Sequence, residues 1–355
     1  MATGIGSRLA ILIRQNPASS AITRNLTSLP HESWAAARML REQEGFDVKL
    51  EWPVQESLTD LRVKAAGQRF FGLPVAPELL RQLRELSHSQ DFLLANTRTW
   101  TIQVALASKL GLVGRCRSAA ITFGLATDLR QLNGLERRLW LWMLSGLDRI
   151  IVNTPVEADD LRALGLRNVS YLVFGVDPEF WSPAAGERNP GGYVFSPGND
   201  PLRDWITLID ACPYPLVVAS TSLPVDKSKL PATVTLTSGT LEDMNRLYAN
   251  CRCVAVTLPE SRRIAGEYTA LQAMSMGKPV VLTHTSGTNL ELFKDGETCF
   301  FIPPGDVKAC SEALEKVWQG GPTVEAVTRQ ARDLVLNRCN AQRYAQDLAQ
   351  ILRSV

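Results

Sequence analysis

The run from Gly266 to Val281 has the residue types and spacing of an anion-binding site. It predicts a turn at Gly266, a helix over residues 267–276 and a buried strand over residues 279–283. A helix N-terminus offers free backbone N–H groups and a partial positive charge, both of which favour phosphate. Glu267 begins this helix, and Gln272 lies in its second turn, where a carboxamide can donate to one hydroxyl and accept from its neighbour. The simpler interpretation is an ordinary helix–strand unit with Gln272 on its surface.

Short apolar runs alternate with amphipathic stretches along the chain, which is typical of α/β proteins with parallel sheets. The expected strands are residues 9–13, 47–51, 91–95, 118–122, 149–152, 193–196, 216–219, 233–237, 254–258, 279–283 and 298–302. The expected helices are residues 33–43, 77–86, 99–110, 134–147, 205–211, 241–249, 267–276, 290–293, 307–319 and 341–353. Trp140 and Trp142 share one of these helices, and we expect them in a core or between domains rather than against a membrane.

The length of 355 residues, with 45% hydrophobic and 21% charged residues, favours two globular domains. A polar stretch that contains Gly and Pro, residues 184–192, interrupts the alternation and reads as a linker. We therefore predict one domain over residues 1–183, a second over residues 184–340 and a closing helix over residues 341–355. Ligands of such doubly wound sheets bind beyond the carboxyl ends of the strands, here in a cleft between the domains.

Charge and cysteine content narrow the choice of partners and compartment. The formal net charge is +2, but residues 1–150 carry 19 Lys and Arg against 13 Asp and Glu. This basic half indicates either an anionic acceptor, a membrane surface or simply a solvated Arg-rich face. No basic stripe interleaved with aromatic residues appears, so we expect no nucleic-acid partner. Seven scattered cysteines and no signal-like segment predict a cytoplasmic protein with reduced core thiols, and leave peripheral contact with the inner face of a membrane open.

Several segments in order closely resemble the C-terminal signature of the family 4, or group 1, glycosyltransferases. Leu271-Gln-Ala-Met-Ser275 and Gly277-Lys-Pro-Val-Val281 correspond to the family's Leu-Glu-Ala-Met-Ala helix and the strand that follows it. The other matching segments are Phe174-Gly-Val-Asp177, Ser196-Pro-Gly-Asn-Asp-Pro-Leu-Arg-Asp204, Lys294-Asp-Gly-Glu297 and Pro303-Pro-Gly-Asp306. The resemblance covers residues 174–306 and implies an α/β fold of the GT-B type, with two Rossmann-like doubly wound domains facing across a cleft.

The resemblance implies roles for residues of the second domain toward a nucleotide-diphosphate sugar. Arg203 would hold the pyrophosphate with its planar charged fork, and Gly198 would let the backbone approach it. Gln272 would bind the ribose hydroxyls. The remaining donor-side positions are Asn199 in the phosphate loop, Thr237, Ser238 and Gly239 at the nucleobase, and Gly266, Glu267, Tyr268 and Thr269 along the phosphates and sugar.

Two departures from the family pattern put part of this mechanism in doubt. The family carries two Glu residues separated by seven positions, and here Ile264 and Gln272 stand in their places. Glu260 or Glu267 is the candidate replacement for the first acid. Asn199 stands where many members have a second basic residue, for which the candidates are Arg262, Arg263, Lys227 and Lys229.

The first domain offers fewer signals. Many members of the family have a His after the fourth strand, whereas here that strand runs into Ala120-Ile-Thr-Phe-Gly-Leu125. The acceptor-side candidates are therefore Thr122, Phe123, the acid Asp128 and His31 in the loop after the first strand. A lone His in a loop is more often an ordinary surface residue.

The resemblance implies a hexosyltransferase-type enzyme that moves a sugar from a UDP- or GDP-sugar to a sugar, lipid or small-molecule acceptor, with retention. It implies no metal and no cofactor, with catalysis by Arg203, Glu267 and the helix N-terminus. The alternatives are a nucleotide-sugar epimerase, which would need placed acid and base groups, and a non-catalytic scaffold that binds nucleotide sugar or a partner protein.

Overall fold

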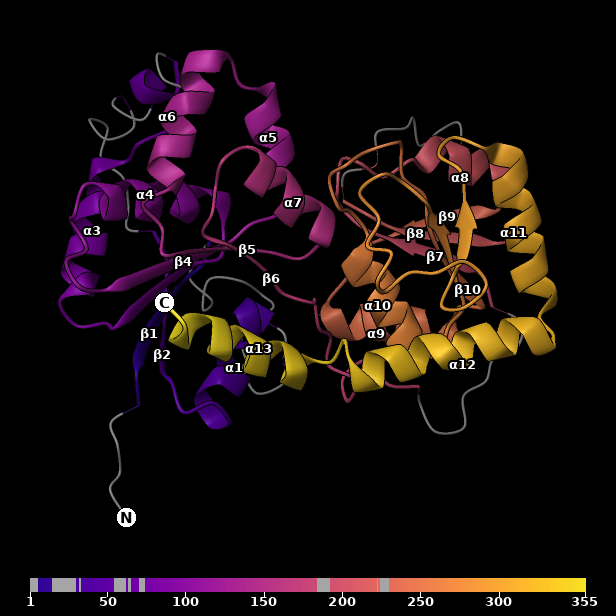
Figure 1. Ribbon diagram of the computed structural model, residues 1–355. Coiled ribbons are helices and arrows are strands. Elements are labelled where there is room, and N and C mark those ends of the chain that lie inside the picture. Colours follow the sequence, from indigo (N-terminus) through magenta and orange to yellow (C-terminus); the bar gives the residue numbers. More distant parts are fainter. Residues whose placement is uncertain are drawn as a thin grey trace. The chain divides into compact units, whose positions relative to one another are not determined.

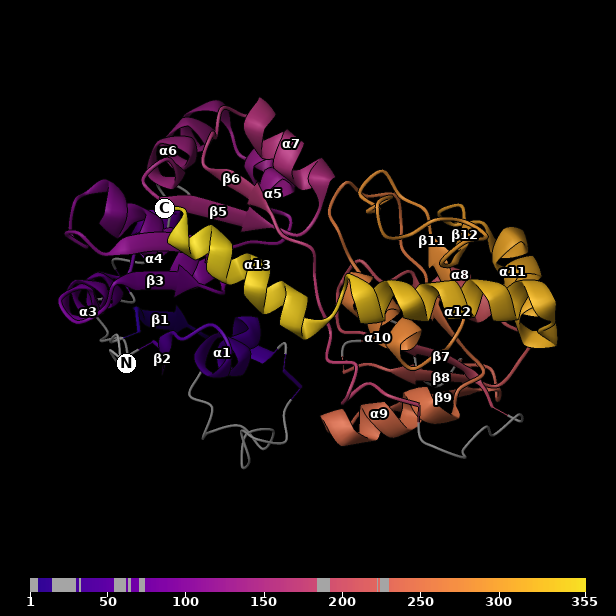
Figure 2. The same cartoon turned by 60° about the horizontal axis from the view of Figure 1, so that its bottom comes forward.

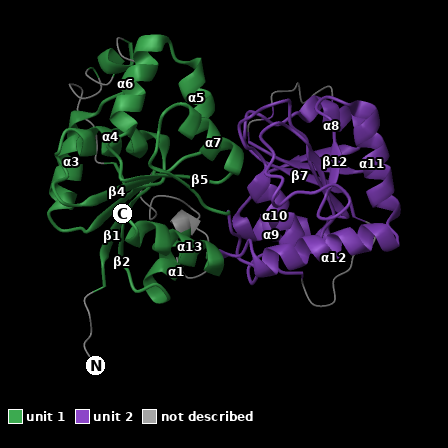
Figure 3. Cartoon of the chain, viewed as in Figure 1, with its two compact units in different colours: residues 1–27, 31–173, 342–355 green, residues 28–30, 174–341 purple. Residues whose placement is uncertain are grey.

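The computed structural model describes residues 6–14, 30–31, 33–53, 62, 65–69, 74–183, 192–221, 223 and 230–355 (Figure 1). The chain divides into two compact units (Figure 3). Unit 1 comprises residues 1–27, 31–173 and 342–355, and unit 2 comprises residues 28–30 and 174–341. The unit boundary at residue 173 precedes the boundary of 183 expected from the sequence, and nearly all of the closing helix belongs to unit 1.

Unit 1 is built on a parallel sheet with the strand order β2-β1-β3-β4-β5-β6. The strands are β1 (Arg8–Leu12), β2 (Asp47–Glu51), β3 (Phe92–Ala95), β4 (Arg117–Ile121), β5 (Arg149–Val152) and β6 (Val169–Tyr171). The helices are α1 (Ser33–Glu42), α3 (Pro77–Ser87), α4 (Arg98–Lys109), α5 (Leu125–Gln131), α6 (Gly134–Leu144), α7 (Pro155–Ala163) and α13 (Ala341–Arg353). At the end of α13, Arg353 donates to Glu44 across 3.1 Å and so fixes the last helix beside α1 (Figure 2).

Unit 2 repeats the architecture with the strand order β12-β11-β10-β7-β8-β9, again all parallel. The strands are β7 (Val194–Pro197), β8 (Leu216–Ala219), β9 (Val234–Thr237), β10 (Cys253–Val256), β11 (Val280–Thr283) and β12 (Phe300–Ile302). The helices are α8 (Trp205–Ala211), α9 (Leu241–Asn250), α10 (Glu267–Ser275), α11 (Val307–Gln319) and α12 (Pro322–Asn337). The sequence therefore predicts the α/β class correctly.

Some elements differ from the sequence-based expectation, for local reasons. The expected helix over residues 290–293 is wrong: Leu292 and Phe293 both bond back to the Asn289 carbonyl, and the chain makes only a turn there. Strand β6, of 3 residues, and helix α5, of 7 residues, were not expected from the sequence. Helices α7 and α12 were also not expected, although each has Pro in its first turn, the usual start signal.

The cores of the units explain most of the apolar pattern. Trp100 and Trp140 lie in the core of unit 1, and Trp205 lies in that of unit 2. Trp140 thus takes the expected core position, whereas Trp142 is 45% exposed and does not lie in the core. All seven cysteines are free and buried, as expected for core thiols. Among the described residues, none of the helices is long and apolar enough to cross a membrane.

The strand order of unit 2 fixes where a ligand binds. The chain enters at the central strand β7, proceeds outward to β8 and β9, and returns to the other side of β7 as β10. The loops that follow β7 and β10 therefore diverge at the carboxyl edge of the sheet. A crevice opens at such a switch point, and ligands of doubly wound sheets bind there. Gly198 follows β7 directly, so the predicted phosphate loop lies at this point.

Candidate functional site

Helix α10 begins at the switch point with its backbone amides uncapped. Its N-cap residue Gly266 has φ 73°, a left-handed conformation that favours glycine, and no side chain caps the helix. A Cβ on Gly266 would lie 2.3 Å from Cγ1 of Val256, at the end of β10, and 3.4 Å from Nη1 of Arg203. The close approach of helix to strand therefore needs glycine here, and it places the positive end of α10 beside the Arg203 guanidinium.

Arg203 is a buried cation with unused hydrogen-bonding capacity. The residue is 6% exposed, and Nη2 donates to the Pro197 carbonyl (2.7 Å) and to Oγ1 of Thr269 (2.8 Å). Within the described part of the chain, its Nε and Nη1 are buried and have no hydrogen-bond partner. Burial lowers the pKa of Arg203 to about 10, so the side chain is still charged at neutral pH. A buried charge without an ionic partner is costly, and an anionic ligand would relieve that cost.

Gly198 covers the other face of this guanidinium. Its φ is 151°, and a Cβ would lie 2.6 Å from Nε and 2.8 Å from Nη2 of Arg203. Glycine is therefore required for the backbone to pass over the charged group. The structure brings together Gly198, Arg203, Gly266 and Thr269, which the sequence had assigned to one phosphate-binding site.

The remaining donor-side candidates lie at the ends of the neighbouring strands. Oδ1 of Asn199 accepts from the backbone N–H of Thr221 (2.8 Å), which ties the loop after β7 to the loop after β8. The N–H of Ser220 in turn donates to the carbonyl of Thr237 at the end of β9 (3.1 Å). Ser238 and Gly239 follow as exposed residues. These contacts align the loops after β7, β8 and β9 into one rim along the carboxyl edge.

Gln272 is buried rather than presented to solvent. It is 6% exposed, and its Oε1 accepts from the Tyr248 hydroxyl (3.0 Å), which also contacts the Thr269 carbonyl (3.2 Å). A carboxamide satisfies this hydrogen bond without the desolvation cost of a carboxylate, which gives a physical reason for Gln where the resembling family has Glu. The ring of Tyr268 packs edge-on against Phe174 with centroids 5.3 Å apart.

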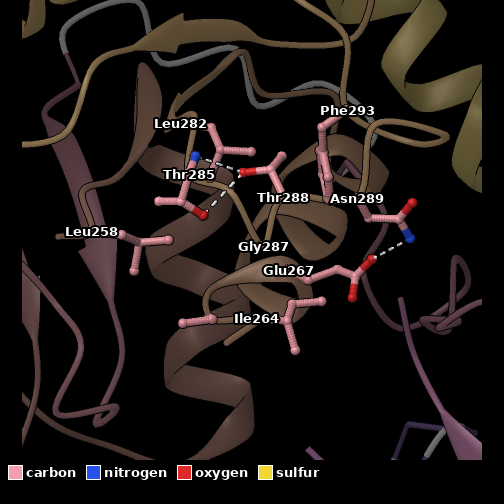
Figure 4. Close-up of a pocket in the computed structure, with 10 residues that line it drawn as sticks. Leu258, Ile264, Glu267, Leu282, Thr285, Gly287, Thr288, Asn289 and Phe293 are labelled. Carbon is pink, nitrogen blue, oxygen red and sulfur yellow. Dashed lines mark hydrogen bonds between the residues drawn. The ribbon is translucent and has the colours of Figure 1, made fainter. Parts of the chain in front are cut away.

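Glu267 lines a small cavity, and its carboxyl lies beside Asn289 (Figure 4). It is 7% exposed, and its Oε1 accepts from Nδ2 of Asn289 (3.3 Å). The cavity of about 10 Å³ is also lined by Leu258, Ile264, Thr285, Thr288 and Phe293. That volume suits about one water molecule and not a sugar ring. Desolvation raises the pKa of Glu267 from 4.5 to about 8, and the Asn289 bond offsets only part of the rise.

The raised pKa of Glu267 makes the stability of the protein depend on pH. Between pH 4.5 and about 8 the unfolded chain has released the Glu267 proton and the folded chain keeps it, so this group lowers the free energy of unfolding as pH rises. Glu267→Gln removes the titration. We expect its stability relative to the native protein to grow between about pH 5 and pH 8, by a few kcal/mol at most, and then to level off. Urea unfolding across this range measures the difference.

The control for this prediction is Glu260→Gln. Glu260 is exposed, and hydrogen bonds from Ser286 lower the pKa of its carboxyl. Its contribution is lost only at acidic pH, so the control should give a constant difference above about pH 5. A constant difference for Glu267→Gln as well would show that the carboxyl is ionised in the folded protein.

The acceptor-side candidates in unit 1 differ in burial and in their partners. Thr122 is buried at the end of β4, and its Oγ1 has no hydrogen-bond partner within the described part of the chain. The next residue, Phe123, is 46% exposed. Asp128 pairs with Nη1 of Arg98 at 3.0 Å, so this acid is already engaged. His31 lies between β1 and α1, and most of the residues next to it in the sequence are outside the described residues.

The candidates for the second donor-side cation and for the first acid have different partners. Nη2 of Arg263 lies 3.9 Å from a carboxylate oxygen of Asp200, so part of its charge is balanced within the loop after β7. Glu260, a candidate for the first acid, binds Ser286 rather than facing Arg203. Lys227 and Lys229 lie outside the described residues.

The sequence of unit 2 matches a family model. Residues 204–320 match the model described as "Glycosyl transferases group 1", beginning directly after Arg203 and including α10. These residues form a group 1 glycosyltransferase domain. The predicted resemblance over residues 174–306 is thereby confirmed for the part of the chain that the model spans. No curated protein matches the sequence.

Solved structures extend the likeness to nearly the whole chain and show the GT-B fold. Sucrose-phosphate synthase from Thermosynechococcus elongatus aligns with a TM-score of 0.73 at 14% identity, covering 98% of each chain. HepE from Anabaena, in complex with UDP and glucose, aligns with a TM-score of 0.67 at 18% identity, covering 90% of this chain and 89% of that one. The lipopolysaccharide outer core galactosyltransferase WaaB aligns with a TM-score of 0.61 at 13% identity, covering 98% and 99%. The residues that match the family model thus belong to a chain with the GT-B fold.

Sequence reasoning missed two residues that organise the site of the group 1 domain. Tyr248 on α9 holds Gln272, and Asn289 after β11 holds Glu267. Tyr248 is the buried residue of the otherwise half-exposed helix α9. The structure shows this burial, and no local pattern in the sequence marks it. No local pattern marks Asn289, because its role depends on the loop after β11 returning to the start of α10.

Proposed function

We propose that this protein transfers a hexose from a nucleotide-diphosphate sugar, UDP- or GDP-linked, to an acceptor, with retention at the anomeric carbon. The observation that carries the proposal is the buried, still charged Arg203, which lies beside the uncapped start of α10 and whose Nε and Nη1 have no hydrogen-bond partner among the residues that the structure describes. A diphosphate supplies the negative charge and the acceptor oxygens that this pair of groups lacks.

The proposed reaction requires stabilisation of the leaving diphosphate. When the bond between the sugar and the diphosphate breaks, negative charge grows on the diphosphate oxygens. Arg203 and the N–H groups of α10 would stabilise that charge, and fixed donors of this kind contribute several kcal/mol to barrier lowering. Because Gly198 and Gly266 cover the guanidinium in this structure, donor binding would require these loops to open slightly or Arg203 to turn. No protein nucleophile and no metal ion take part in the proposal.

The other donor-side residues would serve binding rather than bond breaking. Gln272 would reach the ribose hydroxyls, and the phosphates and sugar would follow the start of α10. The remaining proposed contacts are Asn199, Thr237, Ser238, Gly239, Tyr268 and Thr269 on the donor side, and His31, Thr122, Phe123 and Asp128 toward the acceptor. The acceptor class, a sugar, a lipid or another small molecule, stays open. Catalysis by Glu267 is proposed only as assistance at a distance, because its carboxyl lies beside Asn289 in the small cavity.

UDP-glucose is the first donor to test. HepE, to which this chain is similar in fold, has been solved in complex with UDP and with UDP-glucose. We expect UDP to raise the melting temperature more than GDP, ADP or TDP, equally with and without EDTA. Ligand at about 100 times its dissociation constant stabilises by about 2.7 kcal/mol, which a thermal-shift assay resolves. If no nucleotide stabilises the protein, or if EDTA abolishes the shift, the proposed metal-free donor site is wrong.

A nucleotide-sugar-binding protein without transferase activity is the second candidate. It is favoured by Ile264 and Gln272, which stand where the resembling family has its two Glu residues. The two candidates separate in one assay: UDP binding together with release of UDP from UDP-glucose, in the presence of candidate acceptors, supports the enzyme. UDP binding with no turnover of any donor supports the binding protein.

A further inference from the structure

Tyr248 of α9 holds one end of the Gln272 carboxamide on the neighbouring helix α10 (Figure 1). Both residues are buried, and the Tyr248 hydroxyl donates to Oε1 of Gln272 across 3.0 Å. The hydroxyl also lies 3.2 Å from the Thr269 carbonyl, but that carbonyl is inside α10 and already accepts within the helix. The single hydroxyl proton therefore serves Oε1 first, which has the shorter contact.

The Tyr248 hydroxyl is a fixed donor. Its ring packs edge-on against Trp181, with centroids 5.6 Å apart, and against Phe195, with centroids 5.0 Å apart. Burial raises the pKa of Tyr248 well above 10, and the nearby Arg203 offsets only part of the rise. The hydroxyl thus keeps its proton at neutral and moderately alkaline pH, and it holds Oε1 of Gln272 in one place.

The other end of the carboxamide is left for a ligand. Nε2 of Gln272 carries two N–H donors and has no hydrogen-bond partner in the part of the chain that the structure describes. The oxygen and nitrogen of a carboxamide diverge from one carbon, so holding Oε1 at α9 directs Nε2 away from α9. Thr269, three residues earlier on the same side of α10, accepts from Arg203 (2.8 Å). Three residues span about 4.5 Å of helix, which suits a ribose next to a diphosphate at Arg203.

We propose that Tyr248 is a positioning residue that makes Gln272 a hydrogen-bond donor, so that the site recognises the ribose hydroxyls by their lone pairs. The inference rests on the proposed function, in which Gln272 contacts the ribose. The sequence alone predicted that the carboxamide donates to one hydroxyl and accepts from its neighbour. With Oε1 held by Tyr248, the carboxamide donates to the ribose. A Glu at this position would do the opposite, because an ionised carboxylate only accepts.

Three forms of UDP separate an acceptor from a donor at the 2′ position of the ribose. The hydroxyl of UDP both donates and accepts, the fluorine of 2′-deoxy-2′-fluoro-UDP only accepts, and the hydrogen of 2′-deoxy-UDP does neither. Isothermal titration of the full chain measures the three dissociation constants. We expect 2′-deoxy-UDP to bind about 10-fold more weakly than UDP, the effect of leaving one buried donor without its partner. The fluoro compound should bind with an affinity between the two.

Variants of the two residues show whether Tyr248 sets this preference. Tyr248→Phe frees Oε1, so either end of the carboxamide can face the ribose. Its preference for the fluoro compound over 2′-deoxy-UDP should fall toward that of Gln272→Ala, which reports what ribose pucker alone contributes. Gln272→Glu should reverse the preference, because a carboxylate repels fluorine.

The matched control is Tyr193→Phe. The Tyr193 hydroxyl also bonds to α9, at the Leu247 carbonyl (2.9 Å), and it makes no contact with Gln272. This variant loses a hydroxyl of the same kind from the same helix contact, and it should keep the native preference. Urea midpoints show that the variants are folded, and the comparison on the native protein and on Gln272→Glu tests the proposal even without Tyr248→Phe.

Two results would overturn the inference and leave the proposed function standing. One is a native protein that binds UDP but binds the fluoro compound no better than 2′-deoxy-UDP, because Gln272 would then accept from the ribose. The other is a Tyr248→Phe variant that loses affinity for all three compounds equally, because the hydroxyl would then have only a structural role. Absence of UDP binding by the native protein would overturn the proposed UDP site and this inference together.

Discussion

Arg203→Ala is expected to reduce the rate of sugar transfer about 10²- to 10³-fold, the usual effect of removing one fixed donor to a developing negative charge. The substitution leaves the growing charge on the diphosphate with only the amides of α10. The measurement is the initial rate of UDP release from UDP-glucose, together with the KM for the donor. Because the charge is greater in the transition state than in the bound donor, kcat should fall more than KM rises.

Two further variants separate the charge of Arg203 from its packing. Arg203→Met keeps an apolar stem of similar length, and it removes a buried cation that lacks an ionic partner. It should lose activity as Arg203→Ala does, while its urea midpoint stays equal to or above that of the native protein. Arg203→Lys keeps the charge but not the planar fork, and should retain intermediate activity. Transfer at the native rate by Arg203→Met would overturn the assigned role.

Gly266→Ala is expected to give the largest loss of stability among single methyl additions at this site. The residue has φ 73°, and the new Cβ would lie 2.3 Å from Cγ1 of Val256. The left-handed backbone costs about 1–2 kcal/mol for a residue with a Cβ, and overpacking against a buried strand costs about 1–3 kcal/mol more. Urea unfolding should therefore show a loss of about 2–5 kcal/mol, and UDP affinity should fall because the start of α10 moves.

Gly296→Ala is the matched control for the backbone part of this effect. Gly296 has φ 68°, nearly the same conformation, but a Cβ there would meet nothing within 4 Å. Gly296→Ala should lower the free energy of unfolding only by the cost of the left-handed backbone, about 1–2 kcal/mol, without an effect on UDP binding. Val256→Ala removes the atom in conflict, so the double variant with Gly266→Ala should be more stable than the sum of the single effects. Additive effects would mean that the strand does not limit the helix start.

The order of the elements and the class of the fold were accessible from local sequence. Apolar runs such as Leu216–Ala219, and helices such as Trp205–Ala211 and Val307–Gln319, were predicted to the residue, because periodicity and end signals are local properties. The same holds for Gly266, whose place before a helix indicated a turn. Elements with little periodicity, such as the three residues of β6, were not predictable in this way.

The direction of each side chain was decided by the tertiary structure. The sequence placed Glu267 and Gln272 on one helix and assigned both to the ligand. In the structure the two side chains have different hydrogen-bond partners. Glu267 faces Asn289 in a small cavity, and Gln272 faces Tyr248. Trp140 and Trp142 are two residues apart on one helix, so one lies in the core and the other in solvent.

The sequence by itself thus determined the repeated strand–helix alternation, the family resemblance of unit 2 and the identity of the cationic residue at the phosphate loop. Only the tertiary structure decided that Arg203 lies close to Gly198 and Gly266, with two nitrogens that have no partner in the described part of the chain. The physical reason is that periodicity and turn preferences act over a few residues. Burial and desolvation of a charge depend on which distant segments close over it, and that follows from the order of the strands in the sheet.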